Sequence, residues 1–149
     1  MADVNMILER LKRLAEYVEF LNRKRSLSRD EFLQDQQSQL AVERALQVAI
    51  QIIIDIASHL LATTSNETPK DYSDAIIKLA RIGVIPTTFA KRIAPMPRFR
   101  NVLVHQYIEV DLSRVYRNLQ DDLDDFAEFA RYINAWLDQQ NLNSTELQA

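Results

Sequence analysis

The sequence of 149 residues contains no cysteine, only one glycine and only four prolines. The absence of cysteine excludes disulfide bonds, thiolate nucleophiles and cysteine-ligated zinc or iron–sulfur sites. Because tight turns depend on glycine and proline, their scarcity argues against a fold of many short strands and favours long helices. The most apolar stretch, residues 49–57, is interrupted by Gln51 and Asp55, so we do not expect it to span a membrane. No apolar segment typical of a signal peptide follows the N-terminus, and we expect a soluble cytoplasmic protein.

Helical spacing of apolar residues and local capping signals predict an all-α protein. Asp3 is placed to cap a first helix whose apolar pattern continues to about residue 25. Ser28 and Glu31 form a capping box, and we expect the helix that follows to run as far as Thr63. We expect further helices to start at Thr68–Pro69, near Thr87, near Pro97 and after Asp111, with Gly83 ending the first of these.

These elements predict an up-and-down helical bundle of two long and several shorter helices. The length is enough for a single domain that buries roughly two-thirds of its unfolded surface. We expect this domain to cover residues 1–139 and the polar residues 140–149 to form a frayed C-terminal tail.

Charge is distributed unevenly along the chain. Residues 75–108 contain six basic residues and no acidic residue, whereas residues 109–138 contain eight acidic residues and three arginines. The basic segment is suited to attract phosphate. For the acidic cluster at residues 121–125, a solvated helix surface is the simpler interpretation, and a docking face for a basic partner is the alternative.

The basic segment ends in a motif that contains Arg100, Asn101, His105 and Tyr107. RNA carries its own nucleophile, the 2′-hydroxyl group, so cleavage needs only proton transfer and stabilisation of the charged phosphate. A histidine supplies the first and an arginine supplies the second, without a metal ion. On a continuous helix Arg100 and Tyr107 share one stripe, two turns apart, while Arg100 and His105 are separated by about 140°. We therefore expect a homodimer that brings two motif helices together in one cleft.

Two alternatives to a functional site remain at this point. Taken alone, Arg100 and His105 also fit side chains that satisfy carbonyl groups at a helix end. Asp55 and His59, four residues apart, could in principle bind a metal ion, but two ligands do not make a site. We expect these two side chains to form a partly buried hydrogen-bonded pair instead.

The segment from Arg98 to Tyr107 resembles the signature of the HepT-type HEPN toxins, with Arg-x4-His-x-Tyr intact. The resemblance extends over residues 41–132 and includes the stretches 49–59, 72–80 and 83–85. It implies a dimeric HEPN-like bundle that acts as a metal-independent endoribonuclease without a cofactor. It places the catalytic roles on Arg100 and His105, with Asn101 in support. It also implies a partner, a minimal nucleotidyltransferase antitoxin that adenylylates Tyr107.

Two functions are compatible with these observations. The first is an endoribonuclease toxin of a toxin–antitoxin system, which cleaves RNA and is neutralised by adenylylation of Tyr107. The second is a catalytically inactive helical module that dimerises and docks a nucleotidyltransferase. The combination of Arg100, His105 and Tyr107 favours the first, because an inactive scaffold does not need all three.

Overall fold

The structure is a computed structural model that describes residues 2–148, with side chains placed as far as residue 145. Within these residues every regular element is a helix, which confirms the predicted all-α fold. The elements are α1 (Val4–Lys24), α2 (Arg29–Gln34), α3 (Gln36–Thr64), α4 (Tyr72–Arg81), α5 (Thr87–Ile93), α6 (Met96–His105), α7 (Leu112–Asp121) and α8 (Leu123–Gln148).

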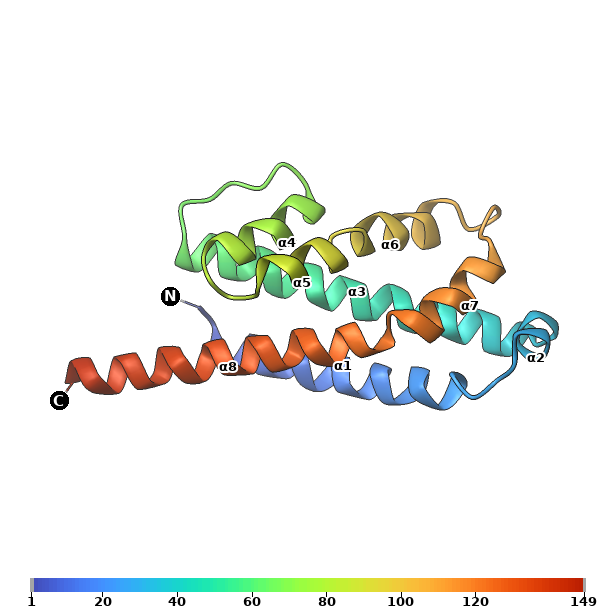
Figure 1. Cartoon of the computed structure of the whole chain (residues 1–149), viewed down its shortest axis with the longest axis horizontal. Coiled ribbons are helices and arrows are strands. Elements are labelled where there is room, and N and C mark those ends of the chain that lie inside the picture. The colour runs from blue at the N-terminus through green and yellow to red at the C-terminus, as the bar shows by residue number, and fades with distance from the viewer. Residues whose placement is uncertain (1, 149) are drawn as a thin grey trace.

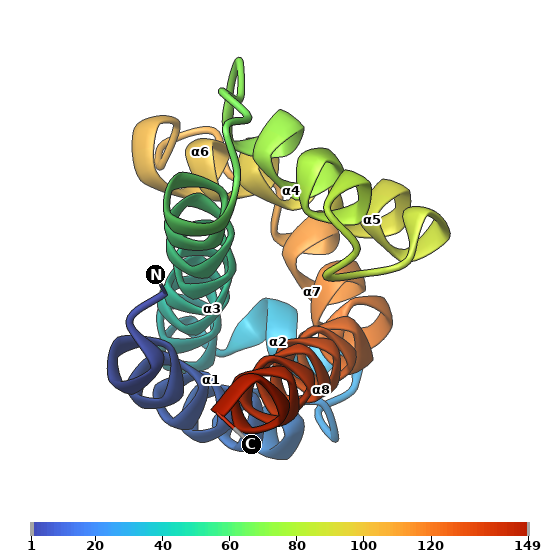
Figure 2. The ribbon, with the colours of Figure 1, turned by 90° about the vertical axis from the view of Figure 1, so that its left-hand side faces the viewer.

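The helices pack around α3, which contacts α1, α4, α6 and α7. Figure 1 shows α1, α3 and α8 running along the long axis of the molecule, with α4, α5 and α6 in series along the other side of α3. In the end view of Figure 2, α3 lies between α1 and α6, and α8 lies beside α1. The described residues thus form three helices of more than twenty residues, α1, α3 and α8, where the sequence predicted two.

The central position of α3 explains its composition. By length and composition alone, α3 is the one described helix that could cross a membrane. This result was not expected, because Gln51 and Asp55 interrupt the apolar stretch of residues 49–57. Most of its apolar stretch is buried inside the bundle, however, and Ile53, Ile56 and Leu60 are completely inaccessible. A helix surrounded by other helices is apolar on most sides, and α3 is so from residue 49 to residue 61, apart from a stripe with Gln51, Asp55 and His59.

The structure confirms the predicted helix caps in which a side chain bonds to a residue two or three positions further along the chain. The side chain of Asp3 accepts a hydrogen bond from the backbone N–H of Met6 at 3.1 Å. Ser28 and Glu31 form the reciprocal bonds of a capping box at the start of α2. Asp111 caps α7 by accepting a bond from the N–H of Ser113.

The prediction of one helix from residue 29 to Thr63 was wrong. The chain leaves the helical conformation at Asp35, whose φ is −111° and ψ 93°, and α3 starts after it. Asp35 caps α3, because its carboxylate accepts one bond from the N–H of Ser38 at 3.3 Å and another from the hydroxyl of Ser38 at 2.7 Å. A side chain that satisfies the free N–H groups of a new helix favours a break at this position.

Two other helix boundaries differ from the prediction. The helix predicted to start at Thr68–Pro69 begins at Tyr72, because Asp71 caps it by accepting a bond from the N–H of Asp74 at 2.7 Å. Gly83 follows this helix with a φ of +83°, as expected for a glycine that ends a helix. The single helix predicted after Asp111 is divided into α7 and α8 by a turn at Asp122.

The last helix continues beyond the predicted domain boundary. Residues 140–148 belong to α8, and the described side chains of residues 138–145 are all exposed. Figure 1 shows this end of α8 projecting past the rest of the bundle. The division into a domain of residues 1–139 and a frayed tail stays a prediction.

Candidate active site on α6

Helix α6 carries the arginine and the histidine of the motif. Its buried face consists of Met96, Phe99 and Leu103, and the helix packs against α3 and α4. The guanidinium of Arg114 on α7 lies 5.0 Å from the centre of the Phe99 ring, which adds a cation–π contact to this packing. Pro97 stands in the first helical turn, where a missing N–H group costs nothing. The apolar face therefore holds α6 in place and leaves its other side to polar residues.

Arg100 is half-buried and only partly satisfied. Its Nη1 atom donates a hydrogen bond to the Oδ1 atom of Asn101 at 2.8 Å. Its Nε atom is buried and has no hydrogen-bond partner among the described residues. A buried donor without a partner is costly in a protein, and Arg100 carries this cost in the described structure. The supporting role expected for Asn101 stays a prediction.

His105 is the last residue of α6 and is exposed to solvent. The helix ends there with a bond from the N–H of Gln106 to the carbonyl oxygen of Val102 at 3.0 Å. No hydrogen bond or ion pair joins His105 to Arg100 within the described chain. Five residues of helix separate them by about 140° and roughly 7.5 Å along the axis. One protomer therefore does not bring the two side chains together.

Tyr107 lies outside the helix, and the expectation that it shares a stripe of α6 with Arg100 was wrong. The carbonyl oxygen of Gln106 accepts a bond from the N–H of Glu109 at 2.9 Å, which closes a turn with Tyr107 and Ile108 at its centre. The Tyr107 side chain is 73% exposed. Figure 1 places this loop between α6 and α7, at the end of the bundle opposite to both chain termini.

The predicted basic segment is partly neutralised by the fold. Arg92 bonds to Asp125 at 3.0 Å and also to Glu128, Lys78 pairs with Asp74 at 2.6 Å, and Arg81 lies 3.8 Å from Glu67. Within the described residues, the three basic side chains of the segment that have no such acidic partner are Lys91, Arg98 and Arg100. Two of these three lie on α6, so the positive charge left for a phosphate is concentrated on the motif helix.

Asp55 and His59 do not form the pair that was expected, because each has other partners. Asp55 accepts a bond from Gln51 at 2.8 Å and lies 3.5 Å from the guanidinium of Arg10. The Nε2 atom of His59 accepts a bond from the N–H of Asp3 at 2.9 Å. Among the described residues no group of three or more histidine, aspartate or glutamate side chains is placed to hold a metal ion.

A cavity of about 190 Å³ lies directly behind α6 and contains an aspartate that the sequence assigned to the solvated surface. Phe99, Arg114 and half-buried Asp122 are among the residues that line it. The pKa of Asp122 is raised to about 6, mainly by burial and then by the nearby carboxylates of Asp125 and Asp121, while Arg114 opposes the change. The sequence assigned Asp122 to a solvated helix surface together with the other aspartates of residues 121–125, so only the packing of α7 and α8 reveals its burial.

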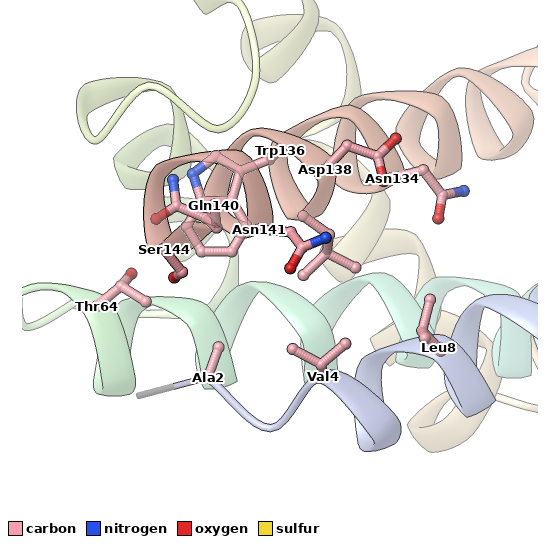
Figure 3. A pocket seen from close by; sticks show the side chains of 11 residues that line it. Ala2, Val4, Leu8, Thr64, Asn134, Trp136, Asp138, Gln140, Asn141 and Ser144 are labelled. Atoms are coloured by element: carbon pink, nitrogen blue, oxygen red, sulfur yellow. The ribbon is translucent and has the colours of Figure 1, made fainter. Parts of the chain in front are cut away.

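A larger hollow of about 570 Å³ lies at the other end of the molecule. Figure 3 shows it between the start of α1, with Val4 and Leu8, and the projecting half of α8, with Trp136 and Asn141. It contains none of the motif residues. This hollow is separate from the candidate site, because it lies at the end of the molecule opposite to the loop that carries Tyr107.

Comparison with known proteins relates most of this chain to nucleases. The family model described as Ribonuclease HepT-like matches residues 7–133. A "tRNA nuclease HepT" from Aphanizomenon flos-aquae is 31% identical over 132 residues, which are 89% of this chain and 90% of that protein. An "mRNA nuclease HepT" from Shewanella oneidensis is 31% identical over 105 residues, which are 70% of this chain and 79% of that protein.

Solved structures share the fold over nearly the whole chain. A tri-AMPylated HEPN toxin from Shewanella oneidensis, in complex with an MNT antitoxin, aligns with a TM-score of 0.78 and 27% identity. The alignment covers 91% of this chain and 99% of that toxin. The family match over residues 7–133 includes both α6 and the loop that carries Tyr107.

Proposed function

This chain belongs to the HepT-like ribonuclease family, and on that premise we propose that it is a metal-independent endoribonuclease toxin of the cytoplasm. The observation that carries this proposal is the half-buried guanidinium of Arg100, which has no acidic partner among the described residues and whose Nη1 atom donates a hydrogen bond to Asn101. A guanidinium placed in this way is ready to bind a phosphate group. The exposed imidazole of His105 on the same helix supplies the proton-transfer group.

The proposed reaction uses the nucleophile of the RNA itself. One histidine takes the proton of a 2′-hydroxyl group, whose oxygen attacks the adjacent phosphorus. The bond from phosphorus to the 5′-oxygen breaks, and a second histidine gives that oxygen a proton. The products are a 2′,3′-cyclic phosphate and a 5′-hydroxyl group. Proton transfer of this kind contributes about 10² to 10⁴ in rate, and Arg100 on the charged phosphate oxygens contributes about 10² to 10³.

The two histidines come from a homodimer in this proposal. Within one protomer, helix geometry separates Arg100 and His105 by about 140°, and no hydrogen bond or ion pair joins them in the described chain. A two-fold arrangement that faces one α6 helix with another presents two arginines and two histidines to the same cleft. Each phosphate then meets a guanidinium and an imidazole, although neither protomer supplies a complete site.

We further propose that a minimal nucleotidyltransferase antitoxin silences the toxin by adding AMP to Tyr107. The phenol oxygen attacks the α-phosphorus of ATP, the bond to the β-phosphate oxygen breaks, pyrophosphate leaves, and a base of the transferase takes the phenol proton. The exposure of Tyr107 supports this step, as does the family relationship to a toxin solved in its AMPylated form with an MNT antitoxin. An added phosphate near Arg100 and His105 repels the RNA backbone.

Cleavage of a labelled RNA by the purified chain in excess EDTA tests the proposal. We expect the wild-type chain to release fragments with cyclic phosphate ends, and His105→Ala and Arg100→Ala to lose at least 100-fold in rate. Lys91→Ala removes another basic residue that has no acidic partner among the described residues but lies outside α6, and it serves as the matched control. An intact RNA with the wild-type chain would instead favour the inactive docking module.

A further inference from the structure

The turn after α6 presents two large side chains side by side. Both ends of the loop are fixed, by the bond from the N–H of Gln106 to α6 and by the Asp111 cap of α7. Between these points the side chain of Tyr107 is 73% exposed and that of Ile108 is 85% exposed. The loop is therefore anchored at its base and projects its apolar tip into solvent.

Ile108 is an unusual residue for this position. The centres of turns favour glycine, asparagine, aspartate and proline, for reasons of backbone geometry that a β-branched side chain does not share. Ile108 is also more exposed than the other large hydrophobic side chains that the structure leaves open, which are Val4, Leu8, Leu40, Tyr72, Tyr107 and Leu142. Single exposed aliphatic residues are common on protein surfaces. Ile108 differs from them because it is next to Tyr107, which enters the active site of the nucleotidyltransferase in the proposed modification.

The geometry points to Ile108 as the residue by which the nucleotidyltransferase recognises its target tyrosine, an inference that rests on the proposed modification of Tyr107. For AMP transfer, the phenol oxygen has to reach the α-phosphorus of ATP inside the transferase, so the tip of the turn enters its cleft. The Cα atom of the next residue is only 3.8 Å away. Ile108 therefore lies at the rim of that cleft, and we infer that it fills an apolar pocket there and fixes the approach of Tyr107.

Burial of an exposed isoleucine on binding predicts the size of the effect. Such a side chain contributes enough to change an affinity about 10- to 100-fold when it is fully buried. In Ile108→Ser we expect kcat/KM for AMP transfer to fall by that factor, mainly through a higher KM, because the nucleophile itself is unchanged. Ile108→Val keeps most of the apolar surface and should stay within about fourfold of wild type.

The experiment measures AMP incorporation from labelled ATP into the full chain by the purified minimal nucleotidyltransferase proposed as its partner, with RNA cleavage measured on the same preparations. Tyr107→Phe identifies the site of incorporation. Leu142→Ser removes another exposed aliphatic side chain, at the projecting end of α8, and should be modified like wild type. Circular dichroism of each variant confirms that the helical content is retained.

The outcomes separate this inference from the function on which it rests. Weaker AMP transfer to Ile108→Ser, with unchanged RNA cleavage, supports recognition through Ile108. Equal transfer to wild type and Ile108→Ser overturns it while the modification of Tyr107 stands. A parallel loss of RNA cleavage would place Ile108 in the RNA site and also overturn it. Failure of the wild-type chain to accept AMP at Tyr107 would overturn the proposed regulation together with the role of Ile108.

Discussion

Replacing Asp122 by asparagine should stabilise the protein at neutral pH. Asp122 lines the cavity behind α6 and its pKa rises from 3.8 to about 6, chiefly because of burial. A rise of this size corresponds to roughly 3 kcal/mol for a group that water cannot reach. Asp122 is only half-buried, so solvent screening reduces the expected gain to about 1 kcal/mol. For a chain of this length that is an increase in Tm of about 3 °C.

The sign of the pH dependence follows from the direction of the change. A carboxyl group whose pKa is raised in the folded state binds its proton more readily there, so its contribution to stability falls as the pH rises from about 4 through 6. The advantage of Asp122→Asn should therefore be full at pH 8 and small at pH 4. Thermal unfolding at both pH values measures it, and Asp138→Asn, at an exposed carboxylate of α8 that does not affect Asp122, is the control. An advantage of Asp122→Asn that is the same at pH 4 and pH 8 would refute the reasoning.

Three further substitutions test other parts of the structure. Arg100→Lys keeps the charge but loses the guanidinium fork and the bond to Asn101, so RNA cleavage should fall about 10- to 100-fold; a rate equal to wild type would mean that a point charge suffices. Tyr107→Phe should cleave RNA at the wild-type rate and resist neutralisation by the nucleotidyltransferase in a growth assay, whereas rescue of growth would place the modification elsewhere. Asp35→Ala removes the cap of α3 and should lower the free energy of unfolding by about 1 kcal/mol in a urea titration, and no loss would show that the cap is dispensable.

Features encoded by neighbouring residues were predictable from the sequence. The caps at Asp3 and Ser28, the turn at Gly83 and the helical character of every element depend on signals within a few residues. Asp35 was missed because the polar residues around it also fit the solvated side of a continuous helix. The end of α6 at His105 was missed because the five residues between it and Asp111 contain neither glycine nor proline.

The candidate site was predictable in its residues but not in its geometry. Arg100, His105 and Tyr107 are recognisable from their spacing, whereas the free Nε atom of Arg100 and the exposed turn of Tyr107 follow from packing. Neutralisation of Arg92 depends on carboxylates of α8 more than thirty residues away in the chain. Such long-range pairs set the charge around α6, and no local pattern reveals them.

Mixing wild-type and inactive chains tests the shared cleft most directly. Wild-type and His105→Ala chains with different affinity tags are unfolded and refolded together, and the species that carries both tags is purified and assayed with labelled RNA. Its cleft keeps both guanidinium groups but only one of the two histidines that the proposed reaction uses, so we predict a rate at least about 100-fold below that of the wild-type dimer. A doubly tagged dimer with half of the wild-type rate would contradict a site assembled from two protomers, because each protomer would then carry a complete site.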